Sequence, residues 1–372
     1  MELVRVLHIV GSLGTGGIQT YLMNLYRNID RSRVQFDFVV HIKEKQSYAS
    51  EIKLLGGRVF YVTDNAFVNK SWKSYIKFWK RFYKEHQEYK IVHSHLRSTS
   101  YIYLREAKKA GLYVIAHSHA TSNGYGKAAK LKDMLQWPTR YIADYYLGCS
   151  EDANIWMFGK KRAKSSNCRV IHNGIDVDKF KFNAENRLKK RVELGLFDTD
   201  FVIGNVGRLI PQKNQEILID AMPGILERKP NAKLLIIGDG VLEQALRKKA
   251  RYNGVDNNVL MLGSRTDIEE LFSAMDVFVL SSRNEGLGIA VIEAQANGLP
   301  AIVSSAIPKE AYITEDIHCV KDNSVGAWVE AVLEQHIVPR RDTSFLMTEA
   351  GYSIQEVADK LCRFYMGILN QN

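Results

Sequence analysis

The chain has few cysteines and no long hydrophobic run, and each shortage narrows its class. Its four cysteines (Cys149, Cys168, Cys319 and Cys362) are scattered through 372 residues without a C-x-x-C pair. This spacing argues against a disulfide framework or a zinc site and fits a reducing compartment. No apolar run approaches the roughly 20 residues that span a bilayer, and the start of the chain reads as a strand and not as a secretion signal. We therefore expect a cytoplasmic protein.

Positive charge is in excess, but only in the first half of the chain. The formal net charge is +10. Residues 1–170 hold 28 lysines and arginines against 13 acidic residues, whereas residues 171–372 hold the remaining 23 against 28. A basic half is either a plain solvated surface or a partner for an anionic membrane or a phosphate-bearing substrate. No nucleic-acid-binding motif is present, so we expect no nucleic-acid partner.

Short aliphatic runs alternate with segments of helical period, and at about 150 residues per domain the length predicts two domains. The alternation predicts parallel sheets with helices on both faces, in two doubly wound α/β units divided near residues 170–200. Ligands bind outside the carboxyl ends of such strands, so we expect the site in a cleft between two facing units. The predicted strands are 4–10, 35–41, 58–62, 91–94, 114–117, 145–148, 169–172, 201–206, 232–237, 259–262, 276–280 and 301–304, and the predicted helices are 18–28, 48–55, 71–88, 98–110, 128–143, 214–228, 241–252, 267–274, 288–298 and 353–369.

A glycine-rich loop follows the first predicted strand. Gly16 and Gly17 open the next helix and can bring backbone N–H groups close to an anion. The loop is not a dinucleotide fingerprint, because Gln19 stands where the third glycine belongs, and it lacks the G-K-[ST] of a phosphate-binding P-loop. A tight turn without a ligand is the alternative.

Four histidines form two H-x-H pairs, His93 with His95 and His117 with His119, each at the end of a predicted strand. Because residues i and i+2 of a strand share a face, each pair could contribute to a metal site. Neither pair has a cluster of carboxylates or cysteines beside it, so we expect no metal. We expect one histidine to face the cleft and bind a substrate, while the others are satisfied locally.

The second half places two cations and two acids in or near loops that follow predicted strands. Arg208 and Lys213 share one loop, where a guanidinium fork and an ammonium point charge suit a diphosphate. Residues 238–240 form a G-D-G turn whose aspartate is a candidate N-cap. Glu285 precedes a helix whose first amides are available to a phosphate, and Glu293 lies inside that helix. Chance charges on surface loops are the alternative.

Six motifs occur in order along most of the chain: G-T-G-G-I-Q at 14–19, A-H-S-H-A-T at 116–121, H-N-G-I-D at 172–176, G-R-L-I-P-Q-K-N at 207–214, G-D-G at 238–240 and E-G-L-G-I-A-V-I-E-A at 285–294. Together they resemble the retaining GT-B glycosyltransferases of family 4, in the branch that builds exopolysaccharide or capsule. The resemblance implies two Rossmann-like domains that face each other across a cleft. Residues 1–170 would bind the acceptor, residues 171–352 the nucleotide sugar, and residues 353–372 would form a C-terminal helix that returns to the N-terminal domain.

The resemblance also implies a role for individual residues. His119 would contact the donor sugar, and Arg208 and Lys213 would neutralise the diphosphate of the leaving nucleotide. Glu285 would contact the donor sugar and Glu293 the ribose. Gln19 replaces an acid that is common in the family, which leaves the acceptor side undefined. The other donor-site residues implied are Gly16, Gly17, Asn173, Gly238, Asp239, Gly240, Gly286, Leu287, Gly288, Ile289 and Ala290.

The implied activity is transfer of a hexose from a nucleoside-diphosphate sugar, usually of UDP, to a growing lipid-linked saccharide with retention of anomeric configuration. No cofactor is implied, because Arg208 and Lys213 would take the place of a metal at the diphosphate. Two other functions stay open. One is a sugar-nucleotide epimerase of the same fold, and the other is a non-catalytic subunit that binds a nucleotide sugar.

The segment 70–84 is both basic and aromatic, with Trp72, Ile76, Trp79 and Tyr83 at helical spacing. One interpretation is that this stripe packs in the core. The other is an amphipathic helix on the anionic inner leaflet of the cell membrane, where a lipid-linked acceptor would be met. For that peripheral attachment we predict membrane contact through Lys73, Lys77, Trp79, Lys80 and Arg81.

Overall fold

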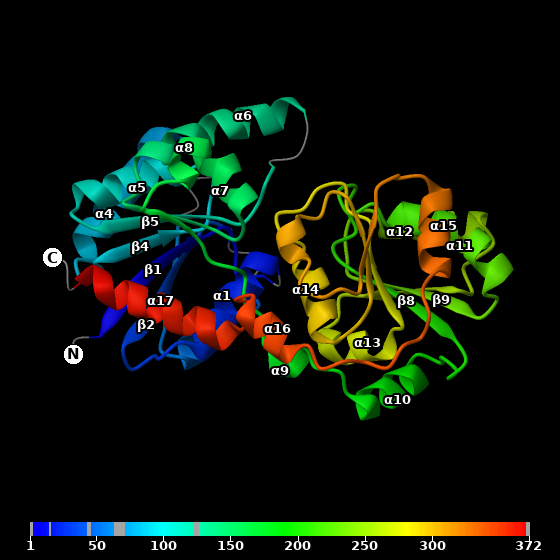
Figure 1. The fold of residues 1–372 in the computed structure, drawn as a ribbon. Coiled ribbons are helices and arrows are strands. Elements are labelled where there is room, and N and C mark those ends of the chain that lie inside the picture. The colour runs from blue at the N-terminus through cyan, green and yellow to red at the C-terminus, as the bar shows by residue number, and fades with distance from the viewer. Residues whose placement is uncertain (1–2, 15, 43–45, 63–70, 123–125, 370–372) are drawn as a thin grey trace. The chain divides into compact units, whose positions relative to one another are not determined.

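A computed structural model of the chain describes residues 3–14, 16–42, 46–62, 71–122 and 126–369. The chain divides into two compact units, here called unit 1 (Met1–Ile175 with Gly351–Asn372) and unit 2 (Asp176–Ala350) (Figure 1). The sequence placed these divisions after residues 170 and 352. Residues 171–175 stay with unit 1 because Ile175 bridges Ser353 and its N–H donates to the carbonyl of Tyr352 over 2.8 Å.

Unit 1 is a parallel sheet with helices on both faces, as predicted. Its strands are β1 (Val4–Val10), β2 (Val34–Val40), β3 (Val59–Tyr61), β4 (Ile91–Ser94), β5 (Tyr113–Ser118), β6 (Tyr145–Gly148) and β7 (Cys168–Val170). Its helices are α1 (Gly17–Asn28), α2 (Ala49–Leu54), α4 (Trp72–Glu85), α5 (Ser100–Lys109), α6 (Lys127–Gln136), the 3₁₀-helix η1 (Trp137–Tyr141), α7 (Glu151–Phe158), α8 (Lys160–Ala163) and α17 (Ile354–Leu369). The strand order is β3-β2-β1-β4-β5-β6-β7, with β1 near the middle.

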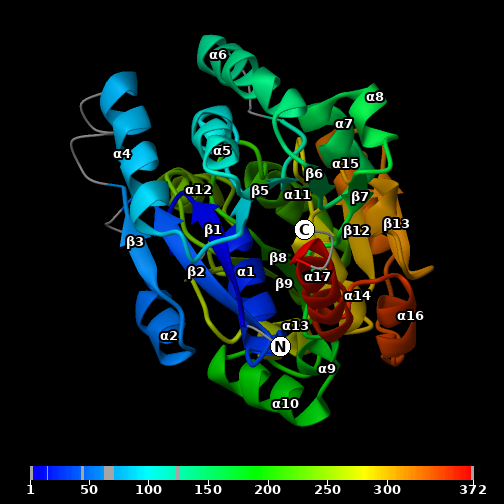
Figure 2. The same ribbon diagram turned by 90° about the vertical axis from the view of Figure 1, so that its left-hand side faces the viewer.

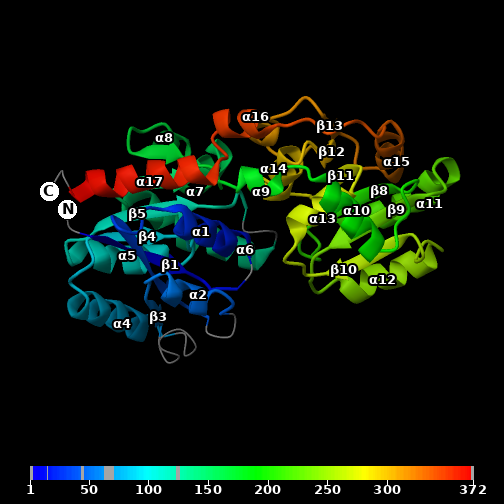
Figure 3. The same cartoon turned by 90° about the horizontal axis from the view of Figure 1, so that it is seen from below.

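The two faces of this sheet follow from the alternation of side chains along each strand. In β1, Val6 and Val10 pack with α1 and α17, whereas Leu7 and Ile9 pack with α4 and α5. The closing helix α17 therefore returns to the N-terminal sheet, as expected, and lies beside α1 (Figures 1 and 3).

The aromatic stripe of α4 belongs to the core, so the prediction that Trp79 faces a membrane is wrong. Trp79 is fully buried and its ring lies 5.1 Å from that of Tyr103 on α5. A helix that packs on a sheet buries a wide part of its surface. In α4 two consecutive residues are buried in the same turn, for example Phe82 and Tyr83. The predicted lysines and arginine are exposed, and Trp72 is half exposed. Lys70 lies outside the described residues.

Unit 2 is a second parallel sheet with helices on both faces. Its strands are β8 (Phe201–Val206), β9 (Ala232–Ile237), β10 (Val259–Gly263), β11 (Val277–Leu280), β12 (Ala301–Ser304) and β13 (Ile317–Val320), in the order β10-β9-β8-β11-β12-β13. Its helices are α9 (Val177–Phe180), α10 (Ala184–Glu193), α11 (Gln215–Arg228), α12 (Glu243–Tyr252), α13 (Ile268–Ala274), α14 (Ile289–Ala296), the 3₁₀-helix η2 (Lys309–Ala311), α15 (Val325–Leu333) and α16 (Ser344–Glu349). Ile203, Leu234 and Trp328 share a core with α11 and α12 on one face.

Several elements differ from the sequence prediction for identifiable reasons. The predicted strand at 169–172 is β7, which pairs with β6 in unit 1 and does not begin unit 2. The predicted helix 128–143 ends at Gln136, and η1 follows with Pro138 in its first turn. Strand β13 was missed because its sequence, I-H-C-V, is half exposed and lacks a continuous apolar run.

The two sheets share one connection pattern. In each sheet the chain first adds strands on one side of its first strand and then adds the rest on the other side. The two directions meet between β1 and β4 in unit 1 and between β8 and β11 in unit 2. Loops at such a switch point diverge and leave room for a ligand at the carboxyl edge. Among the residues that the structure describes, no helix is both long and apolar enough to cross a membrane.

Candidate active site

In unit 2 the loops after β8, β9 and β11 lie next to one another, because these strands are neighbours. The first two loops pack backbone against backbone: the N–H of Leu209 donates to the carbonyl of Asp239 over 2.7 Å. A Cβ added at Gly238 would lie 2.1 Å from the carbonyl oxygen of Gly207, and one at Gly240 would lie 2.4 Å from that of Leu209. The glycines of the G-D-G motif are therefore required by this close approach.

Asp239 is not an N-cap, contrary to one of the two interpretations of the motif. Helix α12 begins at Glu243, with Leu242 in the cap position. The Asp239 carboxylate instead accepts a hydrogen bond from the Ser264 hydroxyl over 2.9 Å. Its place in the loop after β9, beside the loop that carries Arg208, is compatible with the predicted donor-site role.

The switch point of unit 2 carries a cation and an acid in direct contact. Lys213 Nζ lies 2.5 Å from Glu285 Oε1, and the Ser282 hydroxyl donates to the same oxygen over 2.6 Å. The lysine stem passes Gly207, where an added Cβ would meet it at 3.4 Å. The stem therefore packs against the Gly207 backbone at a distance that would still accommodate a Cβ, and Glu285 holds the ammonium at the edge of the sheet.

Arg208 differs from Lys213 in having no fixed partner. Its side chain is exposed and makes no hydrogen bond or ion pair within the described part of the chain. The sequence predicted the two cations as one diphosphate site, and the structure brings both to the same loop between β8 and α11. One charge is positioned and the other is available to an incoming anion.

The loop that carries Glu285 ends in the N-terminus of α14. Gly288 has φ +81°, a left-handed conformation that suits glycine, and Leu287 is buried beneath the loop. Helix α14 begins at Ile289, so the amides of Ile289 and Ala290 lie in its first turn. First-turn amides have no partner inside the helix and can bind an anion. The predicted residues 286–290 therefore form the loop and the first turn of α14, at the carboxyl edge of the sheet.

Glu293 lies one turn further along α14 in an environment that favours its neutral form. Burial and the nearby Glu269 raise the pKa of Glu293 to about 8, although Lys179 acts in the opposite direction. Lys179 is itself paired with Glu269 over 2.8 Å. At neutral pH the Glu293 carboxyl is mostly protonated, so it can donate a hydrogen bond as well as accept one.

Unit 1 gathers five histidines on one face of its sheet, where the sequence predicted two separate pairs. His119 Nδ1 donates to Asn173 Oδ1 over 3.3 Å, and its Nε2 accepts from His95 Nδ1 over 2.9 Å. His95 Nε2 accepts in turn from Nδ1 of His8 over 2.9 Å. His8 had not been singled out, because one histidine inside an apolar strand carries no signal of its own.

A second chain of hydrogen bonds runs beside the first. His93 Nδ1 lies 2.7 Å from the Tyr365 hydroxyl on α17, and its Nε2 lies 3.1 Å from His117 Nδ1. Nε2 of His8 and Nε2 of His117 are buried and have no hydrogen-bond partner in the part of the chain that the structure describes. Most of the ring nitrogens are thus satisfied locally, as predicted for the histidines that do not face a substrate.

Burial keeps these rings neutral. It lowers the pKa of His119 to about 4, with Arg97 adding repulsion and the Asn173 hydrogen bond acting the other way. For His93, His95 and His117 burial and mutual repulsion lower the pKa well below its usual range. At neutral pH the cluster is a set of uncharged hydrogen-bonding groups.

The glycine loop of unit 1 lies at the same carboxyl edge as the histidines. Gly16 occupies the N-cap position with extended backbone, and Gly17 is the first residue of α1. The Gln19 amide folds back and donates to the carbonyl of Ser12 over 3.1 Å. An added Cβ at Gly16 would lie 2.5 Å from Gln19 Oε1, so Gln19 closes the loop locally.

The structure therefore assembles the predicted residues in two places. Unit 1 holds Gly16, Gly17, His119 and Asn173, the last of which was predicted with the nucleotide-sugar domain. Unit 2 holds the others, and the residues that the sequence analysis missed there are Ser282, Glu269 and Lys179. Their types carry no pattern in the sequence, because they act as partners of Glu285 and Glu293 through contacts made only in the fold.

Comparison with known proteins gives two family matches and a relative over nearly the full length. Residues 15–179 match the model described as Glycosyltransferase Family 4, and residues 186–335 match Glycosyl transferases group 1. The putative glycosyltransferase EpsF of Bacillus subtilis is 31% identical over 97% of this chain and 96% of its own. An Escherichia coli UDP-Gal:alpha-D-GlcNAc-diphosphoundecaprenol alpha-1,3-galactosyltransferase is 32% identical over 74% of each chain.

Solved structures share the fold at low sequence identity. HepE of Anabaena, crystallised with UDP and glucose, matches with a TM-score of 0.78 at 18% identity, over 98% of this chain and all of its own. A sucrose-phosphate synthase of Thermosynechococcus elongatus matches with a TM-score of 0.76 at 17% identity, over 99% and 100%. These likenesses confirm two Rossmann-like domains of the GT-B class.

Proposed function

Because the chain belongs to glycosyltransferase family 4, we propose that it moves a hexose from a UDP-sugar to a lipid-linked saccharide with retention of anomeric configuration. The assembly of exopolysaccharide or capsule is the process it would serve. The observation that carries the proposal is the Lys213–Glu285 pair at the switch point of unit 2, with Arg208 in the same loop. The E. coli relative, which uses UDP-Gal and a diphosphoundecaprenol-linked acceptor, supports both choices, and HepE with bound UDP supports the choice of nucleotide.

The chemistry follows from where negative charge develops. When the glycosidic bond to the diphosphate breaks, charge builds on the leaving phosphate oxygens. Lys213, which Glu285 holds in place, and the first amides of α14 would stabilise that charge as preorganised groups, and the exposed Arg208 would turn toward the bound diphosphate. Preorganised groups are the largest single source of rate enhancement in many enzymes. With two cations at the diphosphate, the transfer needs no bound metal.

Glu285 and His119 would bind the donor sugar, and Glu293 would bind the ribose. Glu285 binds Lys213 and Ser282 through its carboxylate and would exchange one of its present partners for a sugar hydroxyl. Glu293, neutral at pH 7, can exchange hydrogen bonds with both ribose hydroxyls. His119, also neutral, would contact the donor sugar once an incoming hydroxyl replaces one of its present partners. No covalent nucleophile is required for attack from the face that the leaving group vacates.

A donor screen tests this function. Thermal shift with UDP-, GDP- and ADP-sugars identifies the donor, and mass spectrometry of the product with a lipid-linked acceptor identifies the transfer. A mass increase of one hexose on the acceptor, with release of UDP, supports the proposal. Conversion of the nucleotide sugar without an acceptor would indicate an epimerase, and binding without turnover on any acceptor a non-catalytic subunit.

Attachment to an anionic membrane is part of the same proposal, with a changed set of residues. Helices α4 and α5 pack on one face of the unit 1 sheet, and α6 lies further out, beyond α5 (Figure 2). On α6 and η1 four large apolar side chains spaced by three or four residues are each more than half exposed, namely Leu131, Met134, Trp137 and Tyr141. The exposed bases of α4 and α6 are Lys73, Lys77, Lys80, Arg81, Lys84, Lys127, Lys130 and Lys132. Apolar anchors among bases are typical of a helix in a membrane interface.

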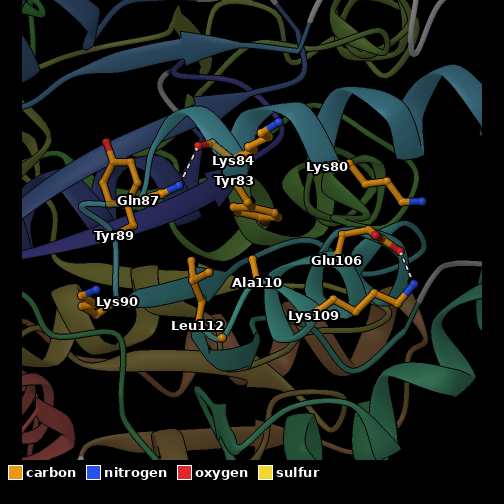
Figure 4. A pocket seen from close by; sticks show the side chains of 11 residues that line it. Lys80, Tyr83, Lys84, Gln87, Tyr89, Lys90, Glu106, Lys109, Ala110 and Leu112 are labelled. Carbon is orange, nitrogen blue, oxygen red and sulfur yellow. Dashed lines mark hydrogen bonds and ion pairs between the residues drawn. The ribbon is translucent and has the colours of Figure 1, made fainter.

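A hollow of about 440 Å³ between α4 and α5 adds to this basic face (Figure 4). Lys80, Lys84, Lys90 and Lys109 line it, together with Glu106, which pairs with Lys109 over 3.1 Å. Lys90 directly precedes β4, so the hollow lies at the amino ends of the strands, opposite the histidines. It would take the phosphate of an anionic lipid and leave the carboxyl edge free for substrates.

Co-sedimentation with vesicles tests the attachment. Vesicles that contain phosphatidylglycerol should carry the protein down, and neutral phosphatidylcholine vesicles should not. Replacing Leu131 and Trp137 by serine should weaken binding, whereas Leu188→Ser, an equally exposed leucine in unit 2, should not. Equal and negligible binding to both kinds of vesicle would refute the attachment and leave the transferase function untouched.

A further inference from the structure

The five-histidine cluster of unit 1 contains more imidazole than contact with one sugar requires. We propose that His95, His117 and His119 form a binding site for one divalent transition-metal ion, of which Zn²⁺ is the type. The sequence argued against a metal because each H-x-H pair lacked a third ligand. The parallel pairing of β4 with β5 supplies that ligand by bringing the two pairs together.

The geometry is close to that of a three-histidine site. One ring nitrogen from each of the three residues lies within 4.8 Å of the others. His95 Nδ1 and His119 Nε2 are already 2.9 Å apart. Two nitrogens that bind zinc at about 2.0–2.1 Å in a tetrahedron are about 3.3 Å apart. The ion would therefore replace one hydrogen bond after the two nitrogens separate by a few tenths of an ångström and both rings turn so that their lone pairs point at the ion.

The third ligand has one ring nitrogen that is not used by any hydrogen bond among the described residues. His117 is 1% exposed, and its Nε2 is buried without a hydrogen-bond partner. Its ring is stacked on that of His119 with centroids 4.0 Å apart. An unpartnered buried nitrogen lone pair is costly, and a metal ion would satisfy it.

Each ligand also has an acceptor for its other ring nitrogen. Nδ1 of His119 donates to Asn173 Oδ1, and Nδ1 of His117 faces His93 Nε2 over 3.1 Å. Nε2 of His95 faces His8 Nδ1 over 2.9 Å. Metal-bound histidines nearly always have such a partner, which orients the ring and raises its basicity. A tautomer shift along His95 and His8 frees Nδ1 of His95 without any change in the number of protons.

The ligand set selects the kind of ion. Three neutral imidazoles suit Zn²⁺, Co²⁺, Ni²⁺ or Cu²⁺, whereas Mg²⁺ and Ca²⁺ prefer oxygen. His119 is the partly exposed member of the three and gives the ion its route of entry. If His119 also contacts the donor sugar, which rests on the proposed function, the ion would compete with that contact and slow the transfer.

Cobalt titration of the metal-free full-length chain tests the site. The chain should take up one Co²⁺ with the visible bands of a tetrahedral site, and Zn²⁺ should displace it. The substitutions are matched to single nitrogens. His117→Asn and His119→Asn keep a polar group near Nδ1 and remove Nε2, and His95→Gln keeps one near Nε2 and removes Nδ1. Each should weaken binding at least tenfold.

Two further substitutions keep the ligands and serve as controls. His93→Gln lies in the cluster but changes no ligand, and His318→Asn replaces an exposed histidine of unit 2. His318→Asn should bind Co²⁺ like the unchanged chain. His93→Gln replaces the partner of His117 Nδ1 and should weaken binding less than any of the three ligand variants. Circular dichroism of every variant confirms its fold. Three results would overturn the site. They are no Co²⁺ uptake by the unchanged chain, ligand variants that bind Co²⁺ as tightly as the unchanged chain, and a loss of affinity in His93→Gln as large as in the ligand variants. All these readings are independent of sugar transfer, so failure of the proposed function would not change them.

Discussion

Units 1 and 2 share a strand order but place opposite kinds of side chain at their carboxyl edges. Unit 1, which carries the basic surplus of the chain, has at this edge a cluster of buried neutral histidines. Unit 2, acidic in total, has at its edge an exposed arginine and a lysine paired with Glu285. The net charge of a domain therefore does not indicate the charge of its site. Basic residues of unit 1 lie on outer helices, and the few cations that would handle phosphate lie in unit 2.

The two units also differ in how they position polar side chains for a ligand. In unit 1 the rings are held by one another and by Asn173, with little exposed surface. In unit 2 an ion pair with Glu285 positions Lys213, and Arg208 has no fixed partner within the described residues. Groups of the first kind suit neutral hydroxyls, and groups of the second kind suit a charged leaving group.

The largest effect should come from Lys213→Ala. Removing a positioned charge from the leaving diphosphate should lower kcat/KM by about 10²- to 10³-fold, as for loss of one donor to a developing oxyanion. Release of UDP in a coupled assay measures it. Lys248→Ala, an exposed lysine on α12, is the matched control and should keep full activity. Unchanged activity in Lys213→Ala would remove the assigned role.

The next effect should come from Glu285→Gln, which keeps the shape but removes the charge that compensates Lys213. Turnover should fall by about 10- to 100-fold, because a carboxylate that holds the sugar is lost. Affinity for UDP itself should stay equal or rise, because the ammonium is no longer neutralised. Calorimetric titration with UDP and with the UDP-sugar measures both. A parallel loss of UDP and UDP-sugar binding would contradict the separation of roles.

A smaller effect should come from His119→Asn in unit 1. Loss of one neutral hydrogen bond to the sugar should lower kcat by about tenfold, which corresponds to about 1.4 kcal/mol. UDP affinity should not change, because the residue belongs to the other unit. The same titrations and assays measure it. If UDP binding fell as much as in Lys213→Ala, the division of tasks between the units would be wrong.

The smallest effect concerns Glu293 and pH. Its folded-state pKa of about 8 exceeds the value of an exposed glutamate, so the folded chain binds more protons than the unfolded chain between about pH 4.5 and pH 8. The stability that protonation contributes is therefore present at low pH and lost as pH rises through 8. The melting temperature of the unchanged chain, relative to that of Glu293→Gln, should fall by a few degrees from pH 6 to pH 9. Parallel melting curves at all pH values would contradict the raised pKa.

Much of the fold could be predicted from the sequence, because buried parallel strands are continuous apolar runs. Strands 4–10, 91–94, 145–148, 232–237 and 301–304 were predicted to the residue. Such a run needs no knowledge of its neighbours. The sequence analysis missed helices α7, α8, α9, α10, α15 and α16. Most of them are short, and several pack on elements that are distant in sequence, as α10 does on α13 and α15 on α11.

The candidate site was predictable where a motif carried it and not where pairing between distant strands did. Lys213 and Glu285 were assigned from their loops, although their direct contact depends on β8 lying beside β11. The histidine cluster could not be predicted, because its formation needs the register that places His8 opposite His93. The prediction that Trp79 contacts a membrane was wrong for a related reason. Helical spacing shows which side chains share a face of the helix, but it does not show whether a sheet or a membrane covers that face.

The central claim is that a diphosphate binds at the switch point of unit 2 through Arg208 and Lys213. Calorimetric titration of UDP and of UMP, with the unchanged chain and with the double substitution to alanine, tests it most directly. The unchanged chain should prefer UDP to UMP by about 10- to 100-fold. The double variant should bind both nucleotides alike, with the affinity for UMP largely kept. A preference for UDP that survives the removal of both cations would contradict the account.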